Sequence, residues 1–384
     1  MMLSLCPIAM NKNIDKSSGW RRVKFGDVVQ LSKARCADPL AEGVERYVGL
    51  EHLEPGELRI RNWGNVADGV TFTSVFRPGQ VLFGKRRAYQ RKVAVADFSG
   101  VCSGDIYVME TKDAQVLLPE LLPFICQTDV FFDHAVGTSA GSLSPRTNWT
   151  SLSDFDFVLP PLEEQHQTLA LLSAGLNTVE KLRAATDALP ILRRSMELQL
   201  LSMGGGPRQR VGEIAKFTSG KGIRVSDLPK NSSNTNPVPV FGGNGISGYT
   251  DTAMNGISEP TVVIGPVGQF CGVTSMTTGA CWITDNALYP AKISQDIHPA
   301  FLAICLRASN LNRSKLGEYL PLITQEVVHK IEIPVPPRSK QSIAIEEFSQ
   351  IEAAEMSLTG RLSSTRSFIQ KVASRMLEGN ADVV

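Results

Sequence analysis

Two short stretches, LPPLEEQ at residues 159–165 and VPPRSKQ at residues 335–341, decide how this chain of 384 residues is organised. In each stretch a pair of prolines follows an apolar run and precedes a long segment with apolar residues at spacings of three and four. Proline is tolerated in the first turn of an α-helix but not further in. Each stretch therefore predicts the end of a front region and the start of a long helix.

The two junctions belong to a longer internal repeat. Four segments recur in the same order in both halves of the chain: a short helical or turn opening, an apolar strand stopped by glycine, a second short segment, and the run that leads into the prolines. The pairs are Phe25–Val29 with Val211–Ala215, Gln80–Gly84 with Thr261–Gly265, Gly100–Cys102 with Gly279–Cys281, and Phe157–Pro161 with Ile333–Pro337. The sequence predicts two copies of one plan.

Each copy has a front rich in Gly, Pro, Asn and Thr, which indicates strands and irregular loops, and a helical back. The predicted parts are an N-terminal tail at 1–19, a first front at 20–160, a first helical segment at 161–206, a second front at 207–336 and a second helical segment at 337–384. The fold class expected is α+β, with two β-rich domains separated by two long helices in a pseudo-twofold repeat.

The apolar stripes of the helical segments favour one helix packing along another. A helical hairpin folded onto its own front is the other arrangement, but two related segments favour an antiparallel, coiled-coil-like pair. Pro190 is expected to kink or interrupt the first helix, unless Asp187 caps a new helix there. The stripe residues predicted to form the spacer and subunit contacts are Leu169, Leu172, Leu176, Val179, Phe348, Ile351, Leu362 and Ile369.

Composition excludes several classes of protein. No stretch reaches the roughly 18 apolar residues of a membrane helix, and the N-terminus lacks the basic region of a signal peptide, so a cytoplasmic location is expected. The seven cysteines and five histidines are scattered, which favours reduced buried thiols and no metal site. The formal net charge is only +1, so any nucleic-acid site must come from local clusters.

The segment Gly243–Gly248 fits the G-x-G-x-x-G pattern of a dinucleotide loop. Such a loop needs a helix directly after it, and residues 249–260 do not have a helical pattern. The glycines are better explained by positive φ and close approach to another group. Motifs of phosphate loops, zinc proteases and amino-methyltransferases are absent from the sequence, and no catalytic centre or cofactor site is predicted in this chain.

Basic residues gather directly after the strand that ends at Gly84. Residues 85–92 hold five basic residues and no acidic one. A solvated hairpin edge guarded by lysines is one interpretation, and a phosphate- or guanine-binding hairpin is the other. The DNA-binding candidates are Lys85, Arg86, Arg87, Tyr89, Arg91 and Lys92 in the first front, and Lys221, Arg224, Gly243, Asn244, Gly245 and Tyr249 in the second.

These features together give the chain a resemblance to the specificity subunits of type I restriction-modification systems over nearly its whole length. The stretches that carry it are YVGLEHLEPG at 47–56, VLFGKRRAYQRKVAVAD at 81–97, GVCSGDIY at 100–107, VPVFGGNGISGYTD at 238–251, CWITDNAL at 281–288 and the two Pro-Pro junctions.

The resemblance implies that the fronts are target-recognition domains, each reading half of a split, asymmetric sequence in double-stranded DNA. It implies that the helices are spacers that set the half-site distance and dock two methyltransferase subunits, which carry S-adenosylmethionine, and that a restriction translocase joins the assembly. A methylation-only or phage-defence complex would use the same architecture. The rival classes are an enzyme acting on DNA or nucleotides through unrecognised residues, and a scaffold that binds no DNA.

Overall fold

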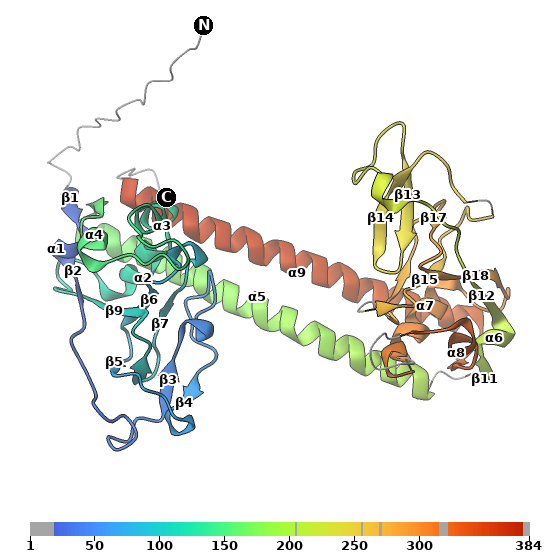
Figure 1. Cartoon of the computed structure of the whole chain (residues 1–384), viewed down its shortest axis with the longest axis horizontal. Coiled ribbons are helices and arrows are strands. Elements are labelled where there is room, and N and C mark those ends of the chain that lie inside the picture. The colour runs from blue at the N-terminus through green and yellow to red at the C-terminus, as the bar shows by residue number, and fades with distance from the viewer. Residues whose placement is uncertain (1–18, 204–205, 255, 269–270, 315–321, 379–384) are drawn as a thin grey trace, which may run out of the picture. The chain divides into compact units, whose positions relative to one another are not determined.

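The computed structural model describes residues 19–203, 206–254, 256–268, 271–314 and 322–378 (Figure 1). The chain divides into two compact units, the first joining Met1–Leu182 with Arg361–Val384 and the second comprising Arg183–Gly360. Each unit contains a β-rich front together with parts of two long helices, α5 (Leu162–Met203) and α9 (Arg338–Glu378). The tail expected at residues 1–19 lies outside the described residues except for Gly19.

The first unit contains three small sheets. Strands β1 and β10 form an antiparallel pair, and the two four-stranded sheets have the orders β2-β9-β6-β7 and β4-β3-β8-β5. Strands β3 and β8 are parallel, and the other pairs are antiparallel. The strands are β1 (Arg21–Lys24), β2 (Val29–Leu31), β3 (Arg46–Val48), β4 (Gly64–Asn65), β5 (Ser74–Phe76), β6 (Val81–Gly84), β7 (Val93–Val95), β8 (Gly100–Cys102), β9 (Ile106–Thr111) and β10 (Asp156–Leu159).

The second unit uses the same sheet plan with one strand fewer among its described residues. Its sheets are the pair β11-β19, the four-stranded β12-β18-β15-β16 and the three-stranded β14-β13-β17, in which β13 and β17 are parallel. The strands are β11 (Arg208–Arg210), β12 (Ala215–Ser219), β13 (Val238–Gly242), β14 (Gly245–Thr250), β15 (Val262–Ile264), β16 (Thr274–Met276), β17 (Trp282–Ile283), β18 (Leu288–Ile293) and β19 (Glu332–Pro334).

The hydrogen bonds give the residue-by-residue match between the two fronts. The Ser103 amide donates to the Val48 carbonyl (3.0 Å), and the Thr284 amide donates to the Phe241 carbonyl (2.9 Å) at the same place in the second unit. Ser103 therefore corresponds to Thr284, and Gly100–Cys102 corresponds to Cys281–Ile283. The match of Gly100–Cys102 with Gly279–Cys281 made from the sequence is wrong by two residues, because both short segments end in an apolar residue followed by cysteine.

The fronts also contain short helices, and of these the sequence predicts only the two that open the fronts, as helical or turn segments. The helices are α1 (Phe25–Val28), α2 (Leu122–Gln127), α3 (Asp129–Gly137) and α4 (Trp149–Ser153) in the first unit, and α6 (Val211–Ile214), α7 (Pro299–Ala308) and α8 (Gln325–His329) in the second. Helix α3 begins where the Thr128 hydroxyl accepts a hydrogen bond from the Phe131 amide, a typical N-cap. Helices α2 and α7 are short apolar runs that are mostly buried, and pattern alone does not distinguish such runs from buried strands.

Both long helices begin directly after their proline pairs, as the sequence predicts, and the stripe residues point inward. Leu172, Val179, Phe348, Ile351 and Ile369 are buried, and Leu169, Leu176 and Leu362 pack partly buried against the core of the first unit. That core also takes in the α9 residues Val372, Met376 and Leu377, so α5 and α9 both contribute to it. In the second unit, Leu200 of α5 and Ala344 of α9 belong to or pack against one core.

Helix α5 continues through Pro190, so the predicted interruption does not occur. Asp187 lies within the helix and approaches Arg183 one turn earlier (4.0 Å), instead of capping a new helix. Proline inside a helix costs about 3 kcal/mol, and its ring must avoid the preceding turn. Pro190 lies on the exposed side, where the ring meets solvent, while packing elsewhere along the helix offsets that cost.

A buried glutamine fixes the first turn of each long helix to its own front. The Gln165 carboxamide donates to the carbonyls of Pro160 and Val116 (2.9 Å each) and accepts from the Leu118 amide (3.0 Å). The Gln341 carboxamide donates to the carbonyls of Pro336 (2.8 Å) and Asp296 (2.7 Å) and accepts from the His298 amide (2.8 Å). Both side chains are essentially inaccessible to solvent. The two helix starts are thus held by the same three-bond arrangement.

The six cysteines among the described residues are free and buried. Burial raises the pKa of Cys102 and Cys305 to about 12, so both are protonated thiols that pack as apolar groups. Among the described residues, no helix has the length and hydropathy needed to cross a membrane.

Replacing Gln165 with leucine should lower the free energy of unfolding by at least about 3 kcal/mol, because three backbone groups lose their partner at about 1–3 kcal/mol each. Gln341→Leu should have a similar effect in the second unit. Urea denaturation followed by tryptophan fluorescence measures both. The control, Gln167→Leu, changes an exposed residue of the same helix and should cost less than about 0.5 kcal/mol. Equal midpoints for Gln165→Leu and the control would contradict the account.

Candidate nucleic-acid interface

The basic segment at 85–92 of the first unit is a structured loop between β6 and β7. It contains a 3-10 turn, η4 (Ala88–Gln90), flanked by Arg87 and Arg91, whose φ values of 53° and 56° are in the left-handed region. Residues other than glycine rarely adopt this conformation, so the loop is held by its surroundings. It is more than the regular edge of a β-hairpin.

Most of the basic side chains of this loop have partners within the first unit. Lys92 donates through Nζ to the Leu50 carbonyl (2.6 Å), and Arg91 pairs with Asp129 and stacks on Phe132. The Lys85 ammonium lies 4.7 Å from the centre of the Tyr107 ring. Arg87 and Tyr89 are the exposed members, and Arg87 donates through Nε to the Ser144 hydroxyl (3.3 Å). Of the six candidates, these two are the most accessible to a ligand.

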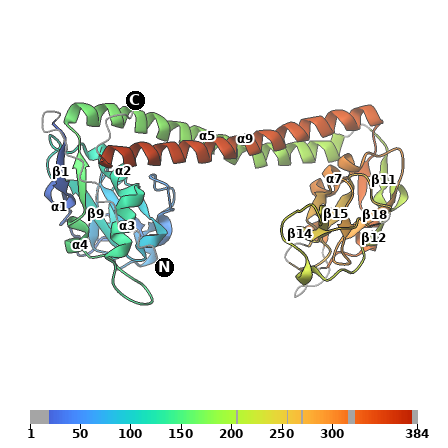
Figure 2. The same ribbon diagram turned by 90° about the horizontal axis from the view of Figure 1, so that it is seen from above.

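A second loop, at residues 138–148 between α3 and α4, lies against the basic loop. The Thr147 amide donates to the Lys85 carbonyl (3.0 Å), and the Arg87 amide donates to the Pro145 carbonyl (2.7 Å). Figure 2 shows this loop projecting from the first unit on the side away from α5 and α9. Asp105 holds two arginines here, Arg86 through Nη1 (3.3 Å) and Arg146 through Nε (3.0 Å).

Arg146 and Asp105 were missed in the sequence because they are 41 residues apart and neither stands in a charge cluster. Arg46 was missed for a similar reason. Its guanidinium carbon lies 4.4 Å from the centre of the Trp63 ring and 5.0 Å from that of Phe98, on the sheet that contains β3. Among the described residues, no hydrogen bond or ion pair joins its guanidinium to a protein acceptor, so its N–H groups are available to a ligand.

In the second unit the glycine-rich segment forms the β13-β14 hairpin, which extends from the unit in Figure 1. Asn244 is exposed at its turn, and Gly245 has a φ of 85°, as a left-handed position after a turn requires. A Cβ at Gly243 would lie 2.9 Å from the Asn286 carbonyl oxygen. The chain continues into β14 and not into a helix. The glycines therefore serve the two purposes expected from the sequence, a positive φ at Gly245 and a close approach to another backbone at Gly243.

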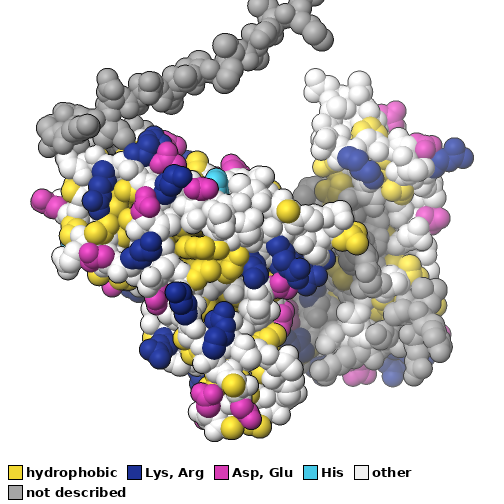
Figure 3. Space-filling view, turned by 60° about the vertical axis from the view of Figure 1, so that its left-hand side comes forward, with side chains coloured by type: hydrophobic (Ala, Val, Ile, Leu, Met, Phe, Trp, Pro, Cys, Tyr) yellow, Lys and Arg dark blue, Asp and Glu magenta, His cyan; other side chains and the backbone are white. Residues whose placement is uncertain are grey.

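The other candidates of the second unit lie around this hairpin. Lys221 is exposed, and its backbone is tied to β17, because its amide donates to the Ile283 carbonyl (2.9 Å). Arg224 is also exposed and approaches Asp227 (3.6 Å). Tyr249 is partly buried on β14, opposite Pro239 of β13. Figure 3 shows Lys and Arg side chains spread over the visible face of the molecule among acidic and apolar ones, and not as one continuous basic field.

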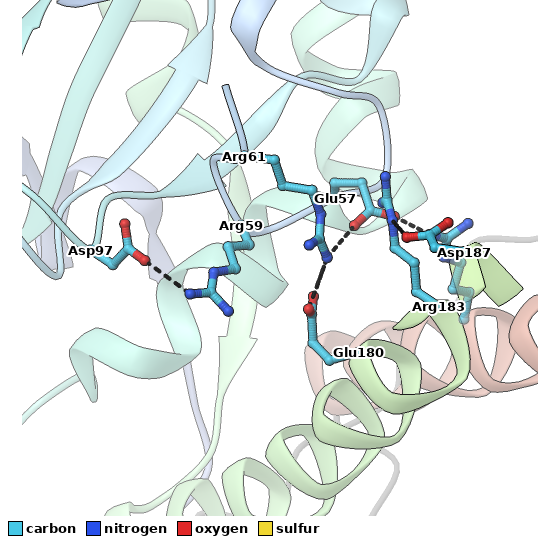
Figure 4. A network of polar contacts seen from close by, with 8 residues as sticks. Glu57, Arg59, Arg61, Asp97, Glu180, Arg183 and Asp187 are labelled. Carbon is cyan, nitrogen blue, oxygen red and sulfur yellow. Dashed lines mark hydrogen bonds and ion pairs between the residues drawn. The ribbon is translucent and has the colours of Figure 1, made fainter. Parts of the chain in front are cut away.

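An ion-pair network connects the first front to both long helices within the first unit. Glu57, 7% exposed, pairs with Arg366 of α9 and approaches Arg61 (3.7 Å), which in turn pairs with Glu180 of α5 (2.7 Å). Figure 4 shows Arg61 between the carboxylates of Glu57 and Glu180, and Arg59 facing Asp97. The network fixes residues 57–61 on the two helices.

The eight predicted stripe residues pack within the chain, so a partner subunit would meet other side chains of the helices. Large apolar side chains are exposed on both, among them Ile191 (73%) and Leu198 (51%) of α5 and Ile343 (60%) and Met356 (73%) of α9. Among the described residues, no group of His, Cys, Asp and Glu is arranged to hold a metal ion.

The chain is similar in sequence to two curated proteins of Escherichia coli. It is 30% identical over 170 residues to the specificity subunit of the type I restriction enzyme EcoDI, and 23% identical over 173 residues to that of EcoprrI. The matches cover 43% and 45% of this chain and 37% and 42% of those proteins, so the chain matches less than half the length of each. No protein-family model matches the chain.

The fold is that of solved type I restriction-modification proteins. A chain from a structure on complex assembly and conformational transition of the type I system matches with a TM-score of 0.61 and 19% identity, over 94% of this chain and 98% of that one. The S subunit from M. genitalium matches with a TM-score of 0.62 and 15% identity, over 96% and 97%. The resemblance found in the sequence is confirmed.

Replacing Arg366 with methionine should destabilise the first unit by about 2 kcal/mol, because it leaves the buried Glu57 carboxylate without this partner. The value is below the 3–5 kcal/mol of fully buried pairs because the Arg366 side chain is 39% exposed. Arg361→Met, at an exposed position of the same helix, should cost little. Thermal unfolding of the two variants measures the difference, and an equal melting temperature would show that the network does not hold the front.

Proposed function

We propose that the chain is the sequence-specific DNA-binding specificity subunit of a type I restriction-modification complex. The observation that carries the proposal is the duplicated sheet framework with chemically different exposed loops, in a chain similar to such subunits in sequence and fold. Two fronts of one plan suit the reading of two half-sites, and different loops suit an asymmetric target. The first front would use Arg87, Tyr89, Arg46 and Arg146, and the second Lys221, Asn244 and Tyr249.

The long helices would set the half-site distance and dock the methyltransferase subunits. Each helix contributes one part to each unit, so the helices connect the two fronts covalently and through packing. The exposed apolar side chains at Ile191, Leu198, Ile343 and Met356 offer area for a partner helix. The stripe residues of the pair would act as spacer and not as the docking surface, since they are covered within the chain.

The chain itself would be non-catalytic and cytoplasmic, with the methyltransferase subunits carrying S-adenosylmethionine and a translocase subunit carrying the nuclease. A methylation-only or phage-defence complex would differ only in these partners. An enzyme would need activated groups at its site, and the thiols with resolved pKa shifts are all moved toward the protonated form. A scaffold would not need the accessible arginines of the first front.

The test is methyl transfer from labelled S-adenosylmethionine to DNA. The chain is co-expressed with the methyltransferase encoded beside it, and transfer is measured with the chain alone, the methyltransferase alone and the complex. The proposal expects transfer by the complex only, and no binding of S-adenosylmethionine by the chain alone. Transfer by the chain alone would favour an enzyme, and a complex that neither binds nor methylates DNA would favour a scaffold.

Arg87→Gln should reduce the salt dependence of DNA binding by the complex. Each lost phosphate contact lowers the slope of log affinity against log salt concentration by about 0.9. The matched control is Arg22→Gln, because Arg22 is an exposed arginine paired with Asp156 on the β1-β10 sheet, away from the two loops. Filter binding over a range of salt concentrations gives the slopes. If the Arg87 and Arg22 variants keep the same slope, the loop is a solvated edge and not a phosphate site.

A further inference from the structure

The two fronts place different side chains at one and the same position. The Lys85 carbonyl accepts from the Thr147 amide (3.0 Å), and the Pro266 carbonyl accepts from the Ile323 amide (2.8 Å). These bonds lie beside two equivalent bridges, Arg86 with Arg146 in the first unit and Val267 with Leu322 in the second. Arg86 therefore corresponds to Val267, and Arg146 to Leu322.

The residue of the second unit that is equivalent to Asp105 follows from the match between strands β8 and β17. Because Ser103 corresponds to Thr284, Asp105 corresponds to Asn286. The first unit thus has an aspartate between two arginines, and the second unit has an asparagine beside a valine and a leucine.

In the first unit Arg146 is oriented for recognition of a planar acceptor pair. Asp105 binds Arg146 through Nε at 3.0 Å, which leaves the terminal nitrogens of a side chain that is 54% exposed. Arg86 is held by Asp105 and by the Ser144 hydroxyl (3.1 Å). The contacts of Arg86 occupy its terminal nitrogens, whereas Arg146, held through Nε, keeps a free N–H fork in one orientation. Such a fork matches the O6 and N7 acceptors of guanine in the major groove.

In the second unit the same position carries two apolar side chains and an asparagine. Val267 is 39% exposed and Leu322 is 38% exposed, although each stands in a backbone pairing that could present a polar side chain. Asn286 and Asn244 are both exposed, and the Asn286 carbonyl lies near Gly243, next to Asn244 in the chain. Among the described residues, neither asparagine side chain has a hydrogen-bond partner.

This combination of an asparagine amide and apolar side chains matches an A·T base pair. An asparagine amide donates to N7 and accepts from N6 of adenine, and small apolar side chains contact the thymine methyl group. Packing does not explain why Val267 and Leu322 are exposed, because an apolar side chain stabilises the fold only through the surface area that it buries.

We propose that the half-site read by the first unit contains a guanine contacted by Arg146, and that the half-site read by the second contains an A·T pair. Asn286 binds its adenine, and Val267 and Leu322 contact its thymine methyl. This assignment rests on the proposed function and adds to it one base pair that each half-site contains.

The experiment selects binding sites from a randomised duplex library with the purified complex of the chain and its methyltransferase partner. The wild type should select a split motif with guanine in one half and an A·T pair in the other. Asn286→Ala should lower discrimination at A·T in one half by about tenfold to a hundredfold, the range for a bidentate pair, and Leu322→Ala should lower it in the same half by a smaller factor. Arg146→Gln, the matched variant of the first unit, should relax a G·C position in the other half only.

A gain-of-function variant separates base reading from loss of folding. Val267→Arg, Asn286→Asp and Leu322→Arg together install the arginine–aspartate arrangement in the second unit. The half affected by Asn286→Ala should then change its preference from A·T to G·C, with the other half unchanged. All substituted positions are exposed, so the melting temperature of the complex should be retained.

The outcomes are distinct. If the wild-type complex selects no motif, the proposed function fails. If it selects a motif but the Asn286 and Leu322 variants leave both halves unchanged, the base assignment is overturned while the function stands. A uniform loss of affinity for all duplexes also overturns it, because that result identifies phosphate contacts or a protein interface.

Discussion

The placement of each front depends on one buried carboxamide. Gln165 and Gln341 each satisfy two carbonyls and one amide that are shielded from water, at the first turn of a helix of about 40 residues. A buried backbone group without a partner costs about 1–3 kcal/mol, so neither helix start can shift along its front without losing several such bonds at once. The helix start in each unit is therefore fixed in one position on its front. The positions of the loops of that front relative to the helix are fixed as well.

A fixed framework allows the exposed positions to vary. The hydrogen bonds around Ser103 and Thr284, and those around Lys85 and Pro266, are the same in the two units. Side chains that leave these backbones toward solvent make no contribution to the sheets. One unit can therefore carry arginines on an aspartate where the other carries asparagine, valine and leucine, and both still fold. This separation of framework from surface is what a protein that reads two different half-sites requires.

The long helices and the repeat could be predicted because their signals are local: proline pairs, three- and four-residue apolar spacing, and repeated order. The effect of Pro190 was misjudged because a local rule cannot account for packing along the rest of α5, which outweighs the cost of the proline. The buried helices α2 and α7 are short apolar runs, which pattern alone does not distinguish from buried strands. Among the site residues, the basic loop was found from its charge, but the Arg86–Asp105–Arg146 group and the stacking of Arg46 on Trp63 join residues distant in sequence, which composition does not reveal.

Single-molecule sequencing of modified bases in host DNA tests the central claim most directly. The DNA is compared between cells that express this chain with its neighbouring methyltransferase and cells from which only this chain is deleted. The account predicts a split, asymmetric methylation motif that disappears on deletion, with guanine in one half and an A·T pair in the other. A methylation pattern that is the same with and without the chain would contradict the account and leave a scaffold without a role in DNA recognition.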